Sequence, residues 1–98
     1  MSGLAQGTGS ANITANTAIT PTTAPTWLFT VHLVSGATSS VLTLKNNGSS
    51  GTSYASIQGV ANQGITVSFE GGLFFPKGLY ATVDANISYA TFSYIQSL

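Results

Sequence analysis

Apolar side chains occupy every second position through much of the chain from residue 26 onward. A period of two is that of a β-strand with one buried face, whereas a helix repeats every three to four residues. In residues 26–34 this alternation places the large apolar side chains on one face: Trp27, Phe29, Val31 and Leu33. Similar runs predict strands at residues 26–34, 41–45, 52–58, 64–69, 73–75, 79–83 and 87–95.

Glycine, proline and asparagine separate these runs at short intervals. The turn signals lie at residues 35–38, 46–51, 70–72, 76–78 and 84–86. Such residues favour turns because they adopt or preset backbone angles that other residues avoid. About seven short strands with regular turns predict an all-β fold, either an antiparallel β-sandwich or a jelly roll.

The first 25 residues differ in composition from the rest of the chain. They are mostly Gly, Ala, Ser, Thr and Asn, with few large apolar side chains, among them Ile13 and Ile19. A segment of this kind cannot by itself bury enough apolar surface to offset the entropy lost on ordering. We therefore predict an extended, low-complexity N-terminal arm over residues 1–25, held against a neighbouring copy, a partner or its own domain, and a β-sandwich domain over residues 26–98.

Charge is almost absent from the chain. Only two lysines and two acids occur among the 98 residues, and their charges sum to zero. A free soluble domain usually devotes about a quarter of its residues to charge, and net charge helps keep copies apart. The four charged residues lie at or next to predicted turns: Lys45, Glu70, Lys77 and Asp84. The uncharged strands and arm therefore indicate a protein that packs against copies of itself or a larger scaffold.

Composition also excludes several classes of function. The chain has no cysteine, which removes disulfides and cysteine-based zinc sites. Two lysines without arginine cannot neutralise a phosphate backbone, so no nucleic-acid partner is expected. The first residues lack the positive and apolar regions of a secretory signal, and no apolar run reaches the ~20 residues of a membrane span. We expect synthesis in the cytoplasm and no membrane partner.

Candidate catalytic groups are few. His32, the single histidine, lies in the middle of a predicted strand, and a hydrolytic site would need Glu70 or Asp84 to orient it. Both acids lie at turns, where a structural role explains them. The stretch Asp84-Ala85-Asn86 begins like a calcium loop but lacks the further acids and the glycine of that motif. We expect no enzyme activity, no cofactor and no metal site.

The C-terminal half contains a distinctive order of turns and apolar positions. Residues 67–83, followed by residues 90–94, comprise a strand that ends in a glycine-led turn, a short apolar-aromatic strand and a Gly-Leu-Tyr opening of the next strand at residues 78–80. This pattern resembles that of small virion proteins of tailed bacteriophages. The resemblance covers about residues 27–95. It implies a β-sandwich structural protein of the virion, a capsid decoration (cement) protein on the capsid exterior. Such proteins commonly form trimers that bridge neighbouring major capsid subunits, often with an extended terminal arm.

We therefore expect a homo-oligomer, with a trimer as the implied form, that binds the major capsid protein and stabilises the head. The residues expected at its assembly interface are Ile13, Ile19, His32, Tyr54, Phe74 and Tyr80. One alternative is a head–tail or tail structural component. Another is a glycan- or receptor-binding β module, in which aromatic side chains such as Trp27 provide a stacking platform.

Overall fold

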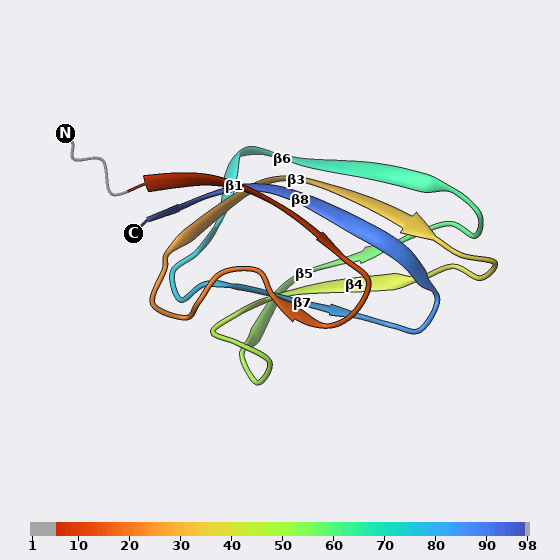
Figure 1. Cartoon of the computed structure of the whole chain (residues 1–98), viewed down its shortest axis with the longest axis horizontal. Coiled ribbons are helices and arrows are strands. Elements are labelled where there is room, and N and C mark those ends of the chain that lie inside the picture. The colour runs from red at the N-terminus through yellow and green to blue at the C-terminus, as the bar shows by residue number, and fades with distance from the viewer. Residues whose placement is uncertain (1–5, 98) are drawn as a thin grey trace.

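The chain folds into two β-sheets that pack face to face (Figure 1). The structure, a computed structural model, describes residues 6–97. Its strands are β1 (Gln6–Ile13), β2 (Thr17–Ala18), β3 (Thr26–Ser35), β4 (Val41–Asn46), β5 (Thr52–Gln58), β6 (Gly64–Phe75), β7 (Leu79–Val83) and β8 (Ile87–Ser97). Neighbouring strands in both sheets are antiparallel. The predicted all-β, antiparallel sandwich is therefore confirmed.

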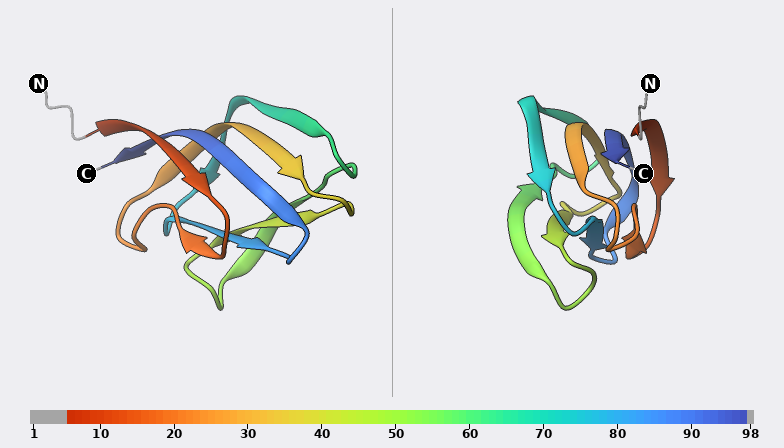
Figure 2. Two further views of the ribbon diagram at one scale, coloured as in Figure 1. Left: turned by 45° about the vertical axis from the view of Figure 1, so that its right-hand side comes forward. Right: turned by 90° about the vertical axis from the view of Figure 1, so that its left-hand side faces the viewer.

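Each sheet takes its strands from both halves of the chain. The first sheet has the order β1-β8-β3-β6, and the second sheet has the order β2-β7-β4-β5. When the chain is folded in half at the β4–β5 turn, each strand lies beside its counterpart, and successive pairs alternate between the two sheets. This arrangement is the jelly roll, in which eight strands form two Greek keys. Figure 2 shows the two layers from further directions.

The predicted strands agree closely with those of the structure, with one correction. β3, β4, β5, β7 and β8 all begin at the predicted residues. Residues 64–69 and 73–75, predicted as two strands, form the single strand β6. Gly71 and Gly72 have φ angles of +78° and +87°, which glycine adopts without a steric penalty because it has no Cβ. These glycines distort β6 instead of ending it.

The described part of the expected N-terminal arm is built into the sandwich. β1 pairs with β8 along its whole length, and β2 pairs with β7. Gly9 lies opposite Tyr94, and a Cβ at Gly9 would overlap the tyrosine ring, so glycine lets β1 approach β8. Ile13 is only 6% exposed and belongs to the core, which corrects its expected place at an assembly interface. Residues 1–5 of the expected arm lie outside the described residues.

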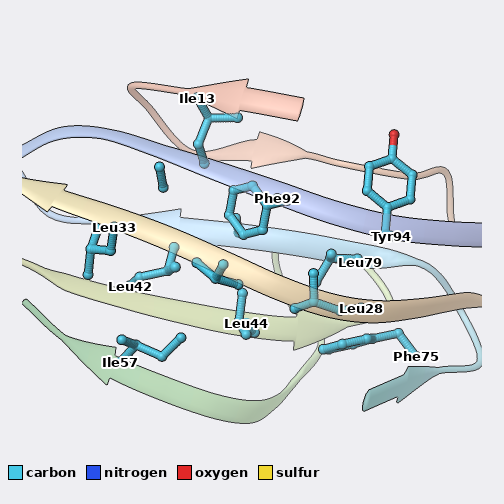
Figure 3. Close-up of a cluster of buried hydrophobic side chains, with 13 residues drawn as sticks. Ile13, Leu28, Leu33, Leu42, Leu44, Ile57, Phe75, Leu79, Phe92 and Tyr94 are labelled. Atoms are coloured by element: carbon cyan, nitrogen blue, oxygen red, sulfur yellow. The ribbon is translucent and has the colours of Figure 1, made fainter. Parts of the chain in front are cut away.

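Large apolar side chains from both sheets fill the space between them (Figure 3). The fully buried members are Leu28, Val31, Leu33, Phe75 and Phe92 in the first sheet and Leu42, Leu44 and Leu79 in the second. Burying apolar surface stabilises a fold by about 25 cal/mol per Å². The core therefore holds the two inner faces together and leaves most polar side chains of both sheets on the outer faces.

A β-bulge in β3 changes which of its aromatic side chains face the core. Phe29 is an extra residue relative to β8, where Leu28 pairs with Tyr94 and Thr30 with Ser93. Against β6, residues 69–72 lie opposite this one position. An extra residue reverses the alternation between inward and outward positions. Leu28 and Val31, three residues apart, are both buried, whereas Trp27 and Phe29 lie on the outer face, beside β6. The prediction that both aromatic residues share an inner face with Val31 and Leu33 is wrong, because alternation alone does not reveal a bulge.

A buried network of hydroxyl groups fastens the β2–β3 connection to β7. Thr20 Oγ1 accepts a hydrogen bond from the Leu79 N–H at 2.8 Å and shares another with Thr26 Oγ1 at 2.7 Å. Thr26 Oγ1 also donates to the Ala24 carbonyl at 2.8 Å. Buried polar groups are stable only with such partners. The network therefore holds a segment whose composition offers almost no apolar surface for burial.

The bulge leads to a testable difference between two neighbouring residues. We expect Leu28→Ala to lower the free energy of unfolding by about 2–5 kcal/mol, because it leaves a cavity between the sheets. Phe29→Ala should cost less, since the Phe29 ring lies on the outer face beside Gly72. Urea unfolding of both variants measures the difference. A loss for Phe29→Ala equal to or larger than that for Leu28→Ala would contradict the bulge.

Candidate assembly surfaces

Small uncharged polar side chains cover much of the outer face of the first sheet. One row across its four strands consists of Ser10, Ser93, Thr30 and Ser68, and the next consists of Asn12, Thr91, His32 and Thr66. The Thr91 hydroxyl donates to Asn12 Oδ1 at 3.2 Å, and His32 Nδ1 shares a hydrogen bond of 2.8 Å with Thr66 Oγ1. These rows contain no carboxylate or ammonium group. A neighbour can therefore cover this face without removing a charged group from water.

Each sheet also ends in two edge strands, which differ in how well they are protected. Exposed edges offer unpaired N–H and C=O groups to other chains, and proteins usually protect them with charge, proline, bulges or short length. β6 carries Glu70 and the kink at its glycines, and β2 is two residues long. β1 and β5 are eight and seven residues long and contain neither a charged residue nor a proline. Within residues 6–97, β1 and β5 are therefore the two unprotected edges, and they lie on opposite sides of the sandwich (Figure 2).

The free hydrogen-bonding groups of β5 can be assigned to particular residues. The Gly59 N–H donates to the Ser40 carbonyl at 2.8 Å, and these two residues come directly after Gln58 and before Val41, which lie opposite each other in the register. In an antiparallel pair, hydrogen-bonded and non-hydrogen-bonded positions alternate. The N–H and C=O groups of Ile57 therefore point toward β4, and those of Ser56 and Gln58 point outward from the free edge.

Aromatic side chains gather on the side of the sandwich where β5 and β6 lie. Tyr54, which is 40% exposed, stacks on Phe75 with ring centroids 5.2 Å apart. Phe74, which is 42% exposed, stacks on Trp27 at 4.7 Å. Because Phe74 and Phe75 are adjacent in β6, their rings lie on opposite faces of the first sheet, and the four rings surround the end of that strand. We call these four residues the aromatic cluster; exposed aromatic side chains of this kind are enriched at the centres of protein interfaces.

The six residues expected at an assembly interface do not form one patch. Tyr54 and Phe74 belong to the aromatic cluster, and His32 lies on the outer face of the first sheet. Tyr80 is half-buried and lies opposite Lys45 in the register of the second sheet. Ile19 is half-buried against the core. The alternation of side chains placed Trp27 in the core, and the open edge at Ser56 and Gln58 was not predicted, since an edge is defined only by the order of strands in a sheet.

The two acidic residues, Asp84 and Glu70, lie at the β7–β8 turn and at the kink of β6. Asp84 accepts hydrogen bonds from the Val41 N–H at 3.0 Å and the Asn86 N–H at 3.1 Å, so its carboxylate holds the β7–β8 turn against β4. Glu70 is exposed at the kink of β6. Within residues 6–97, no group of three or more His, Cys, Asp or Glu side chains is arranged to hold a metal ion. The same residues contain no helix long and apolar enough to cross a membrane.

Comparison with protein families and with curated proteins finds no match for this sequence. In structure, the chain is similar to a protein of Bacillus endospore appendages, which form a family of disulfide-linked pili. The TM-score is 0.53 with 12% sequence identity, and the alignment covers 94% of this chain and 85% of that chain. At this identity the similarity concerns the fold. It agrees with the all-β architecture described above.

The aromatic cluster provides a test of where copies of the chain meet. We expect Phe74→Ala to weaken self-association by at least about fivefold, because truncating an aromatic side chain at an interface centre commonly costs more than 1 kcal/mol. Tyr89→Ala is the matched control, since Tyr89 is 37% exposed but stands beside His32 and outside the cluster. Sedimentation velocity over a dilution series measures both variants. Equal effects of the two substitutions would rule out a special role for the cluster.

Proposed function

We propose that this protein is a structural subunit of a virion, a capsid decoration protein that binds the outer surface of a tailed-bacteriophage head as a homo-oligomer. The observation that carries the proposal is the pair of uncharged, unprotected edge strands β1 and β5, together with the exposed rings of Tyr54 and Phe74 on the β5 side. A chain with these features and no net charge has little to keep its copies apart. The proposed partners are other copies, with a trimer as the implied form, and the major capsid protein.

The physical demands on a decoration protein match this surface. Such a protein must recognise a joint between shell subunits and then resist its opening. Many weak contacts repeated over several linked copies provide this through avidity, without any single strong site. Hydroxyl rows and strand edges make contacts through neutral hydrogen bonds, which salt screens far less than ion pairs between exposed charges. The resemblance of residues 67–83 and 90–94 to small virion proteins supports the capsid as the place of assembly.

A second candidate function is that of a filament subunit, favoured by the similarity in fold to the Bacillus appendage protein. That protein belongs to pili that are disulfide-linked. This chain has no cysteine, so copies in a filament would be held by non-covalent contacts alone. Both candidates are structural assemblies of identical chains, and they differ in whether the assembly is closed or open-ended.

The assembly itself is tested on the purified chain. We expect a discrete oligomer by light scattering coupled to size exclusion, unchanged from about 0.05 M to about 1 M NaCl because exposed charges contribute little to the contacts. Negative-stain imaging of the same sample separates the two candidates, since a decoration protein gives small closed particles and a filament subunit gives fibres. A chain that stays monomeric at every accessible concentration would overturn both.

The capsid role is tested on phage heads. Heads assembled without the protein should release their DNA at a lower temperature than complete heads, because fewer contacts hold the joints between shell subunits. Adding the purified wild-type chain back should restore the release temperature, and adding Phe74→Ala at the same concentration should restore less of it. Heads whose release temperature is the same with and without the protein would exclude a decoration role.

A further inference from the structure

The two unprotected edges belong to different sheets and to opposite sides of the sandwich. β1 ends the first sheet, and β5 ends the second sheet on the side where β6 also lies (Figure 2). The two strands are similar in length and in their small, uncharged side chains. One molecule therefore presents two edges of similar chemistry, facing in opposite directions.

We propose that copies of this chain associate head to tail, with β1 of one copy adding as a further strand beside β5 of the next. The first sheet of one copy then continues into the second sheet of its neighbour. This inference rests on the proposed function, since it assumes that the chain assembles with itself. It names the surface and the partner: the β5 edge and a second copy of the same chain.

Covering both edges favours this pairing over the symmetric ones. In a two-fold contact, β1 pairs with β1 or β5 pairs with β5, and each dimer leaves the other edge of both copies exposed to solvent. An exposed, uncharged edge continues to attract strands from other chains. A contact between β1 and β5 covers the β1 edge of one copy and the β5 edge of the next. Every interior copy of the assembly therefore has both of its unprotected edges covered.

The β5 side also supplies an apolar anchor for the incoming strand. The outward N–H and C=O groups of Ser56 and Gln58 offer backbone hydrogen bonds. Tyr54 lies in the same strand and stacks on Phe75 at the end of β6. Backbone bonds along an edge combined with side-chain contacts beside it are the means by which extended segments bind to sheet edges.

This contact accounts for either form of assembly. A head-to-tail contact repeats with a constant rotation between copies, and the rotation decides whether the chain of copies closes into a ring or continues as a filament. A closed ring of three suits the decoration protein, and an open helix suits the filament subunit. The two candidate functions therefore need the same strand pairing and differ only in the angle at which it is made.

Disulfide trapping tests the pairing cleanly because the chain has no cysteine of its own. Double variants combine Ser10→Cys in β1 with one cysteine in β5, at Ser53, Ser56 or Gln58, so that different registers are sampled; all four positions are exposed. A disulfide requires Cα atoms within about 7 Å, which directly opposed residues on neighbouring strands satisfy. We expect at least one double variant to give a ladder of covalent dimers, trimers and larger species under mild oxidation.

Trypsin identifies the linked segments, because the only two basic cleavage sites are Lys45 and Lys77. The expected product joins the peptide of residues 1–45 to the peptide of residues 46–77. The matched control replaces Ser10→Cys by Ser93→Cys, which lies opposite Ser10 on β8, one strand in from the edge. This shift of about 4.8 Å takes the cysteine out of disulfide range, so the control should give no ladder.

The outcomes separate this inference from the proposed function. If wild-type protein assembles but no double variant forms the expected product, or if the single Ser10→Cys or Ser56→Cys variants cross-link to themselves instead, head-to-tail pairing is wrong while the structural role stands. A ladder from the Ser93→Cys control equal to that of the test variants also overturns the pairing. A monomeric wild-type chain overturns both proposals.

Discussion

Burial of leucine, valine and phenylalanine side chains between the two sheets determines what this chain shows to its surroundings. With these residues directed inward, the intervening Ser, Thr and Asn side chains are turned outward by the two-residue period of a strand. The same packing fixes the strand order, and the strand order decides which strands lie at the edges. The largely polar outer faces and the open edges thus follow from how the core is filled.

The N-terminal segment shows how tertiary pairing replaces local stability. By composition, residues 6–18 offer few apolar groups, yet they supply β1 and β2. Their order comes from the backbone ladder with β8 and β7 and from close approach at Gly9. Thr20 extends the attachment through its buried hydrogen bonds. A segment held mainly by backbone pairing at the edge of a sheet is also one that can offer its other side to a neighbour.

The aromatic cluster depends on the two irregularities of the first sheet. The bulge at Phe29 turns Trp27 outward, and the distorted β6 continues past its glycines to bring Phe74 beside it. Without these departures from regular alternation, Trp27 would lie in the core. Bulges often redirect side chains at functional surfaces, and here they create the exposed aromatic surface that self-association is proposed to use.

Alternation and turn residues determined the all-β class and the starts of six strands, and composition alone showed the near-absence of charge, because each of these is a local property of the chain. They also identified Tyr54 and Phe74 as candidate contact residues. Strand order, the fusion of residues 64–75 into β6, the inward position of Ile13 and the outward position of Trp27 depended on tertiary structure. The open edges also depend on tertiary structure. β5 is an edge because no other described strand pairs with its outer side, and no local sequence pattern encodes which strand will lie at an edge.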